Sequence, residues 1–194
     1  MIKYLNLKNK LLFFLLVFFI LLCSSIQANN IKNSAVVLMY HKFNKSNYPS
    51  TNISMEQFKL HLEELSKPEY NVMPLNLIID SIINDVDLPN KTIGISVDDA
   101  DRSFLEHGWP LLKEYNFPVT LFVTTNTISD TNKNYLNWKE IRALKDQGVT
   151  IGAHSHTHSH LSKFSIEQIK EEIETSNKIF LREIKEIPNI FAYP

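Results

Sequence analysis

Lys91-Thr-Ile-Gly-Ile-Ser-Val-Asp-Asp-Ala-Asp101 is a short apolar run that ends abruptly in carboxylates. Strands buried in parallel sheets are continuous apolar runs, so residues 92–97 are predicted to form one. Ligands of α/β folds bind where such strands end, and Asp98 and Asp99 stand at that point. The pair can supply one metal ligand and one spare base. The alternative interpretation is that both carboxylates only cap the following helix.

Gly152-Ala-His-Ser-His-Thr-His-Ser-His160 holds four of the chain's seven histidines. Neutral imidazoles bind Zn²⁺, Ni²⁺, Cu²⁺ and Fe²⁺. His154 and His158 are four residues apart, so they share a face in extended chain and in a helical turn. Two imidazoles and one carboxylate would leave coordination positions open for water and substrate. The alternative is a solvated loop or a loose, metal-buffering histidine tract.

Residues 1–28 are predicted to be a secretory signal peptide. Three lysines precede twelve uninterrupted apolar residues, Leu11–Leu22, and small or polar residues follow up to Ala28. The apolar run is shorter than the roughly 20 residues that span a bilayer, so membrane contact is expected only if this segment is retained. Cleavage after Ala28 would remove Cys23, the single cysteine, and export the protein to the periplasm, the cell surface or the medium.

Residues 29–194 are predicted to form one domain. Hydrophobic residues make up 44% of the chain and the formal net charge is −1, which is typical of a globular protein. This balance argues against disorder and against a basic nucleic-acid-binding face. The oligomeric state is not indicated.

Strands and helices are predicted to alternate along this domain. The expected strands are a buried first strand at residues 34–40, followed by 71–75, 92–97, 117–123, 149–153 and 189–193. One expected helix starts at Ser54 and runs up to Pro68, and two others cover residues 77–83 and 103–115, with a new first turn or a kink at Pro110. The last two are a helix that starts at Asn137 and ends at Gly148, and a helix of about five turns that starts at Ser165 and ends before Pro188. Capping boxes at Ser54, Asn137 and Ser165 indicate three helix starts, and Gly148 indicates one helix end.

This alternation implies a mostly parallel α/β sheet with right-handed crossovers, either open or closed into a barrel. The functional side chains are then expected where the strands end. His41, the Asp98–Asp99 pair, the segment from His154 to His158, and Tyr193 all follow predicted strands. Each of these residues follows a different predicted strand, so we expect them to meet at one edge of the sheet and to form a common site.

The two motifs, in this order, resemble those of the polysaccharide deacetylases of carbohydrate esterase family 4, the NodB homology domain. Ser-Val-Asp98-Asp99-Ala is similar to that family's Thr-Phe-Asp-Asp-Gly motif. The segment from His154 to His158 is similar to its His-(Ser/Thr)-x-x-His motif. Met-Tyr-His41 and Pro118-Val-Thr-Leu-Phe-Val also resemble members that act on poly-N-acetylglucosamine. The resemblance covers the chain from about Val36 onward.

The resemblance implies a distorted (β/α) barrel and a metal-dependent hydrolase that removes N-acetyl groups from an acetylated polysaccharide of the N-acetylglucosamine type. It implies a divalent metal held by Asp99, His154 and His158, with zinc as first candidate and Fe²⁺, Co²⁺ or Ni²⁺ as alternatives. Asp98 would be the base that deprotonates metal-bound water. The backbone N–H of Tyr193 would stabilise the oxyanion.

The chain departs from the family pattern in three places. Phe191 lies in the region where the family carries an arginine that orients the base, and Ala100 replaces a glycine. The chain also stops before the motif with the histidine thought to protonate the leaving amine. We therefore expect a partial, C-terminally truncated barrel that folds poorly and turns over weakly or not at all, with His41 as a possible substitute acid.

Two other functions remain open. The protein could be a secreted pseudoenzyme that binds metal or glycan without turnover, or an ester deacetylase that acts on an acetylated glycan. His156 and His160 are predicted to be outer-shell or solvent residues, although their spacing also makes them a rival metal pair.

Overall fold

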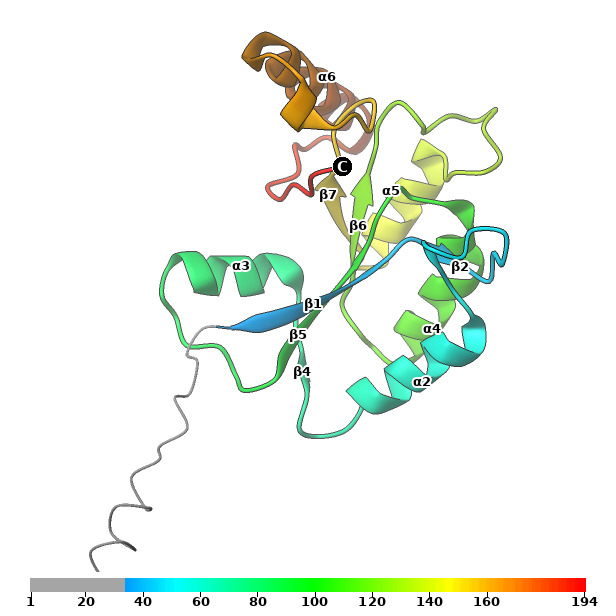
Figure 1. Ribbon diagram of the computed structural model, residues 1–194, viewed down its shortest axis with the longest axis vertical. Helices are drawn as coiled ribbons and strands as arrows, with labels where there is room; N and C mark the ends of the chain where they lie inside the picture. Colours follow the sequence, from blue (N-terminus) through cyan, green and yellow to red (C-terminus); the bar gives the residue numbers. More distant parts are fainter. Residues whose placement is uncertain (1–33) are drawn as a thin grey trace, which may run out of the picture. The chain divides into compact units, whose positions relative to one another are not determined.

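Five parallel strands form the main sheet of the computed structural model, which describes residues 34–194 (Figure 1). The predicted signal peptide lies outside the described residues. Among the helices of the described part, none is long and apolar enough to cross a membrane.

Strand β5 is the centre of the sheet. The strands of the main sheet are β1 (Ala35–Tyr40), β4 (Asn71–Val72), β5 (Thr92–Val97), β6 (Thr120–Val123) and β7 (Thr150–Ala153). One edge of β5 pairs with β1 along its whole length, from Ala35 beside Thr92 to Tyr40 beside Val97. Its other edge is shared, because β4 pairs with its first residues and β6 with its last. Strand β7 then pairs with β6.

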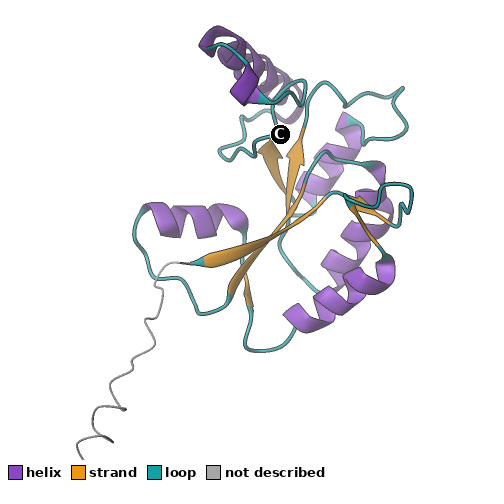
Figure 2. Ribbon diagram, in the orientation of Figure 1, coloured by secondary structure: helices purple, strands orange, loops and turns teal. Residues whose placement is uncertain are grey.

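A helix is present in each predicted region, although its ends differ from the prediction by a few residues. Figure 2 shows the helices in purple around the orange strands. The helices are α2 (Met55–Leu65), α3 (Leu75–Ile83), α4 (Trp109–Glu114), α5 (Trp138–Asp146) and α6 (Ile166–Ile184), with a 3₁₀ turn at Leu161–Lys163. The three predicted capping boxes are all present, with both reciprocal hydrogen bonds. Gly148 follows α5 with φ +97°, a conformation that favours glycine at a helix end.

The predicted helix at residues 103–115 is divided in two. A π-helical turn, Phe104–Gly108, precedes α4, and the Trp109 N–H donates to the Phe104 carbonyl five residues earlier. Pro110 has no N–H to donate and its ring crowds the preceding turn, so a regular α-helix cannot continue through it. The predicted irregularity at Pro110 is confirmed, in the form of a widened turn.

Side chains of β5 alternate between two different environments. Ile93, Ile95 and Val97 point into the main core, together with apolar side chains of α2, α4, α5 and α6. Gly94 faces the other way, toward α3, because a Cβ atom at this position would lie 3.2 Å from both Ile78 Cδ1 and Leu75 Cδ1. Figure 1 shows α3 on one side of β1 and β5, with α2 and α4 on the other. The period of two places Asp98, the next residue after the strand, on the side opposite the main core.

The predicted burial of the first strand is wrong. Val36, Val37 and Met39 are 56%, 44% and 62% exposed. Strand β1 is the end strand of the sheet and has one partner, β5, within residues 34–194. An apolar pattern shows that a side chain can be buried, but the neighbouring elements decide whether it is.

Three other predicted elements differ in extent. The predicted strand at residues 189–193 is a single parallel bridge between Phe191 and Ala153, flanked by two backbone hydrogen bonds of 3.0 Å. The predicted strand at 71–75 ends at Val72, because Pro74 already caps α3. The segment between the first predicted strand and the first predicted helix contains a small parallel sheet of β2 (Lys42–Phe43) and β3 (Asn52–Ile53), which the sequence did not indicate.

Gly152 is required by close packing inside β7. A Cβ atom at this position would lie 2.4 Å from Cδ1 and Cε1 of the Phe122 ring on β6. We expect Gly152→Ala to lower the free energy of unfolding by about 1–3 kcal/mol, since the ring cannot move without displacing its buried neighbours. Gly94→Ala is the matched control, because its contacts are flexible side-chain ends at 3.2 Å. Urea unfolding that ranks the two variants in the opposite order would contradict this packing.

Candidate active site

Asp99, His154 and His158 lie together at the carboxyl ends of β5 and β7. One potential ligand atom from each lies within 4.8 Å of the others. His158 Nε2 is 3.1 Å from Asp99 Oδ1, and His154 Nε2 is 3.7 Å from the same oxygen. The two imidazole rings are 4.9 Å apart between centroids. The structure therefore brings together the three residues that the family resemblance predicts to be metal ligands.

His154 is held in one tautomer by the C-terminal segment. Its Nδ1 lies 2.9 Å from the carbonyl oxygen of Ala192. A carbonyl only accepts, so Nδ1 carries the proton and the lone pair of Nε2 faces Asp99. Burial lowers the pKa of His154, which favours the neutral form that a metal ligand requires. No motif in the sequence marks Ala192, although the next residue, Tyr193, is predicted to belong to the site.

A tight turn brings His158 back toward His154. Ser155 and His158 both adopt left-handed backbone conformations, with φ of 61° and 62°. The Ser155 hydroxyl accepts a hydrogen bond of 3.1 Å from the His158 N–H. The His154 N–H donates to the Val123 carbonyl at 3.1 Å, which fixes the start of the turn on β6. The turn itself therefore sets the separation of the two imidazoles.

Asp98 is a buried carboxylate next to this cluster. Burial raises its pKa to about 6, while nearby His41 acts in the opposite direction. His41 Nε2 lies 4.0 Å from Asp98 Oδ2. Among the described residues, Asp98 Oδ1 is buried without a hydrogen-bond partner. A carboxylate with a raised pKa is a stronger base than an ordinary aspartate and is still ionised at neutral pH.

The turn after β5 is strained at the proposed ligand. Asp99 and Ala100 are both left-handed, with φ of 74° and 55°. Such a conformation costs a residue like alanine about 1–2 kcal/mol, whereas aspartate adopts it more readily. Ala100 therefore stands at a position where φ is positive. Glycine, which occupies this position in the motif that the sequence resembles, would avoid the cost.

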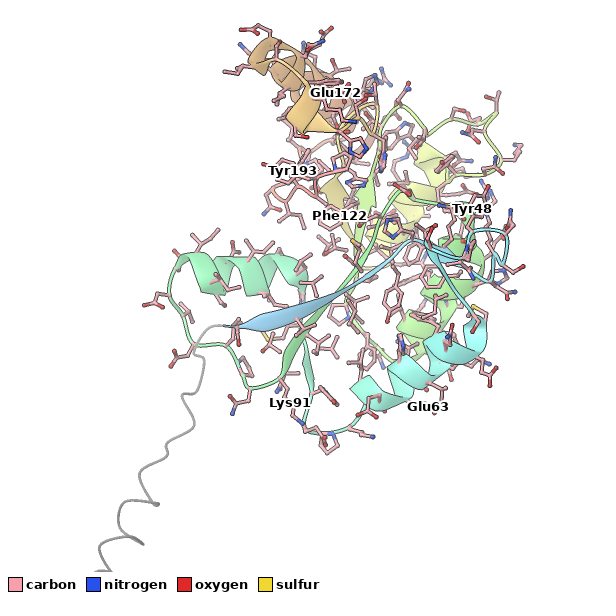
Figure 3. All side chains as sticks on the ribbon, in the orientation of Figure 1. Tyr48, Glu63, Lys91, Phe122, Glu172 and Tyr193 are labelled. Carbon is pink, nitrogen blue, oxygen red and sulfur yellow. The ribbon has the colours of Figure 1, made fainter. Side chains whose placement is uncertain are left out.

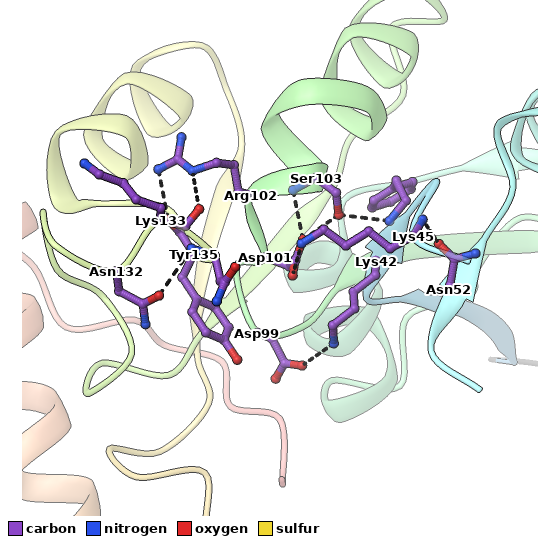
Figure 4. A network of polar contacts seen from close by, with 12 residues as sticks. Lys42, Lys45, Asn52, Asp99, Asp101, Arg102, Ser103, Asn132, Lys133 and Tyr135 are labelled. Carbon is purple, nitrogen blue, oxygen red and sulfur yellow. Dashed lines mark hydrogen bonds and ion pairs between the residues drawn. The ribbon is translucent and has the colours of Figure 1, made fainter. Parts of the chain in front are cut away.

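A polar network next to this turn holds it in place (Figure 4). Buried Asp101 accepts hydrogen bonds from the Ser103 hydroxyl at 2.6 Å and from Lys45 Nζ at 2.9 Å. Arg102 forms a two-pronged ion pair with Glu140, at 2.8 and 3.0 Å. These contacts connect the turn to the loop after β2 and to α5.

Lys42 adds a positive charge that the sequence did not indicate. Its Nζ lies 3.9 Å from Asp99 Oδ2 and 5.1 Å from the ring centroid of Tyr48. The signal was hidden because Lys42 belongs to β2, a strand too short to be recognised from its sequence.

The remaining predicted residues lie around the cluster. His156 Nδ1 is 2.9 Å from the Thr125 hydroxyl, so its ring is held by the loop after β6. His160 is exposed and lies outside the three-residue group. The Tyr193 side chain is 80% exposed and packs edge-on against Phe191 (Figure 3). Its proposed backbone contact with an oxyanion stays a prediction.

The chain is similar to proteins of one family. The sequence model described as polysaccharide deacetylase matches residues 85–194, more than half of the chain. Poly-beta-1,6-N-acetyl-D-glucosamine N-deacetylase of Staphylococcus aureus is 24% identical, and the match covers 84% of this chain and 65% of that protein. A Bacillus subtilis relative is 23% identical, and the match covers 81% and 55%. The chain thus spans between about half and two thirds of the length of these relatives.

Solved structures confirm the predicted fold class. The Streptococcus pyogenes deacetylase PplD in complex with acetate superposes with a TM-score of 0.75 and 20% identity, over 84% of this chain and 74% of that chain. IcaB from Ammonifex degensii gives a TM-score of 0.71 and 21% identity, over 82% and 73%. The α/β architecture is that of NodB-type deacetylases, a distorted (β/α) barrel.

We expect zinc binding to depend on the three clustered residues. His154→Ala and His158→Ala should each lose stoichiometric zinc after dialysis, because two remaining ligands do not hold the ion. His156→Ala and His160→Ala are matched controls from the same histidine stretch and should retain it. Equal zinc content in all four variants, measured by atomic absorption, would rule out this assignment.

The charge of Asp98 should destabilise the metal-free fold. Its pKa is raised, so the ionised carboxylate lowers the free energy of unfolding above about pH 6. This destabilisation disappears as the pH falls toward 3.8, the ordinary pKa of an aspartate. We expect Asp98→Asn to raise Tm in chelator at pH 7 by about 2–4 °C, on the order of 1 kcal/mol. The gain should vanish near pH 4.

Asp101→Asn is the matched control for this prediction. Burial raises the pKa of Asp101, but hydrogen bonds from Ser103 and Lys45 outweigh it and leave the pKa lowered. Its charge therefore stabilises the fold above the ordinary pKa, and Asp101→Asn should lower Tm at pH 7. Tm changes of the same sign in both variants would contradict the proposed electrostatics.

Proposed function

Because the chain belongs to the polysaccharide deacetylase family, we propose that it hydrolyses N-acetyl groups on a polysaccharide of the N-acetylglucosamine type. The observation that carries this proposal is the cluster of Asp99, His154 and His158 beside the buried base Asp98. The similarity to a poly-beta-1,6-N-acetyl-D-glucosamine N-deacetylase supports the substrate class.

The proposed enzyme depends on a divalent metal, with zinc as first candidate and iron, cobalt or nickel as alternatives. Asp99, His154 and His158 would hold the ion. Their chemistry fits it, since one carboxylate oxygen and two neutral imidazole nitrogens converge and the His154 lone pair already faces the group. When bound, such an ion polarises an acyl carbonyl and lowers the pKa of water.

Asp98 would act as the general base. Hydrolysis breaks the amide C–N bond, adds the water oxygen to the acyl carbon and returns a proton to the amine, so one group must first take a proton from the water. The Asp98 carboxylate has a pKa of about 6 and an oxygen without a partner among the described residues. His41 lies at 4.0 Å and limits the rise of this pKa. The N–H of Tyr193 is proposed to donate to the developing oxyanion.

We further propose that the protein acts outside the cytoplasm. The lysines and apolar run of residues 1–28 support export by a signal peptide. Surface and extracellular polysaccharides would then be accessible to the site.

Acetate release tests this function. We expect the zinc-loaded protein to release acetate from poly-N-acetylglucosamine or chito-oligosaccharides. Asp98→Asn should lower kcat by about 10²–10⁴-fold without loss of zinc, because an amide cannot accept the proton. His160→Ala, outside the cluster, is the activity control.

Three outcomes would contradict the proposal in different ways. Unchanged turnover in Asp98→Asn would remove Asp98 from its role. Acetate from acetylxylan alone would indicate an ester deacetylase. Stoichiometric zinc without acetate from any of these substrates or from peptidoglycan would indicate a binding protein.

A further inference from the structure

Glu172 is a buried carboxylate on α6 that contacts the turn between the two proposed histidine ligands (Figure 3). Its Oε2 accepts hydrogen bonds from two successive backbone N–H groups, His156 at 3.0 Å and Thr157 at 2.9 Å. Its Oε1 accepts the Thr157 hydroxyl at 2.7 Å. One side chain thus binds two of the three residues that separate His154 from His158.

The same turn is also held from other directions. Ser176, one helical turn after Glu172, donates its hydroxyl to the Ser155 carbonyl at 3.3 Å. The Thr125 and Asn126 N–H groups donate to the Ser155 and His156 carbonyls at 3.3 and 2.9 Å. The backbone between the two histidines is therefore bound on one side by α6 and on the other by the loop after β6.

Glu172 is the charged member of this set. Burial raises the pKa of Glu172, but hydrogen bonds from Thr157 and His156 outweigh it and leave the pKa lowered. The carboxylate is therefore anionic at neutral pH and makes charge-assisted hydrogen bonds, which are about twice as strong as neutral ones.

Attachment of the helix does not by itself require this carboxylate. Helix α6 already packs into the main core through Phe180 and Ile184, near its C-terminal end. An apolar side chain at position 172 could add packing without the cost of burying a charge. The Glu172 side chain ends in two polar atoms, of which one binds the two adjacent N–H groups and the other binds the Thr157 hydroxyl, a pattern that no apolar side chain can reproduce. These groups belong to a turn with left-handed residues at Ser155 and His158.

We propose that Glu172 is a positioning residue for the metal: it holds the Ser155–Thr157 turn so that His154 and His158 converge on Asp99. This inference rests on the proposed function, because the geometry that Glu172 maintains is that of the metal ligands. Glu172 acts through the backbone and does not touch the ion or the substrate.

Zinc affinity and a cobalt spectrum test this role. Competition with a chromophoric chelator gives the zinc Kd, and the visible absorption of the Co²⁺-substituted protein reports ligand geometry. We expect Glu172→Ala to weaken zinc binding by about 10–100-fold and to alter the Co²⁺ spectrum. Glu172→Gln keeps an acceptor oxygen for the two N–H groups and an amide for the Thr157 hydroxyl, so it should restore most of the affinity.

Two control variants separate positioning from general stability. Glu171→Ala removes the exposed neighbouring carboxylate and should leave zinc affinity unchanged. Ile184→Ala truncates a buried side chain near the other end of α6, so it should lower Tm while zinc affinity stays within about threefold of the native value. Amide hydrogen exchange in chelator should be faster at His156 and Thr157 in Glu172→Ala than in Ile184→Ala.

The outcomes distinguish this inference from the proposed function. Native zinc affinity and an unchanged Co²⁺ spectrum in Glu172→Ala would overturn the role of Glu172 alone. An equal loss of zinc affinity in Ile184→Ala would also overturn it, because the weaker binding would then result from the lower stability of the fold and not from the loss of the Glu172 contacts. Failure of the native protein to bind zinc would overturn the proposed metal site, and the role of Glu172 with it.

Discussion

The pairing of β5 with its neighbours is the constraint on which the site depends. Both edges of β5 are bonded, and the Asp98 N–H continues the ladder to the Tyr40 carbonyl at 2.9 Å. Strand β6 carries the same register on to β7, which ends just before His154. A slip of one residue in either ladder would move the following side chain to the opposite face. The separation of carboxylates and imidazoles is thus set mainly by backbone hydrogen bonds.

Much of this arrangement could be predicted from the sequence because its signals are local. The apolar run before Asp98, the three capping boxes and the spacing of His154 and His158 each depend on a few adjacent residues. The missed features depend on residues distant in the chain. Exposure of β1 is decided by its neighbours, and the contacts of Ala192 with His154 and of Lys42 with Asp99 join segments that carry no motif.

The site is maintained at a cost to stability. Asp99, Ala100, Ser155 and His158 have left-handed backbones, and Asp98 is a buried charge. Such costs persist where the surrounding structure over-determines the local conformation. Here the surroundings are the polar network after β5 and the hydrogen bonds around the histidine turn. The left-handed backbone conformations that weaken the fold also make the proposed ligands converge, and the burial that destabilises the Asp98 charge also raises the pKa of this base.

Ala100 also limits how this sequence can change in evolution. Its side chain is fully buried and its φ is 55°, so space excludes large residues while the backbone disfavours branched ones. Glycine relieves the backbone but gives up a buried methyl group, which leaves two nearly balanced choices at this position. Position 100 therefore tolerates few residues other than alanine and glycine, so the shape of this turn leaves little freedom in the sequence beside the proposed ligand Asp99.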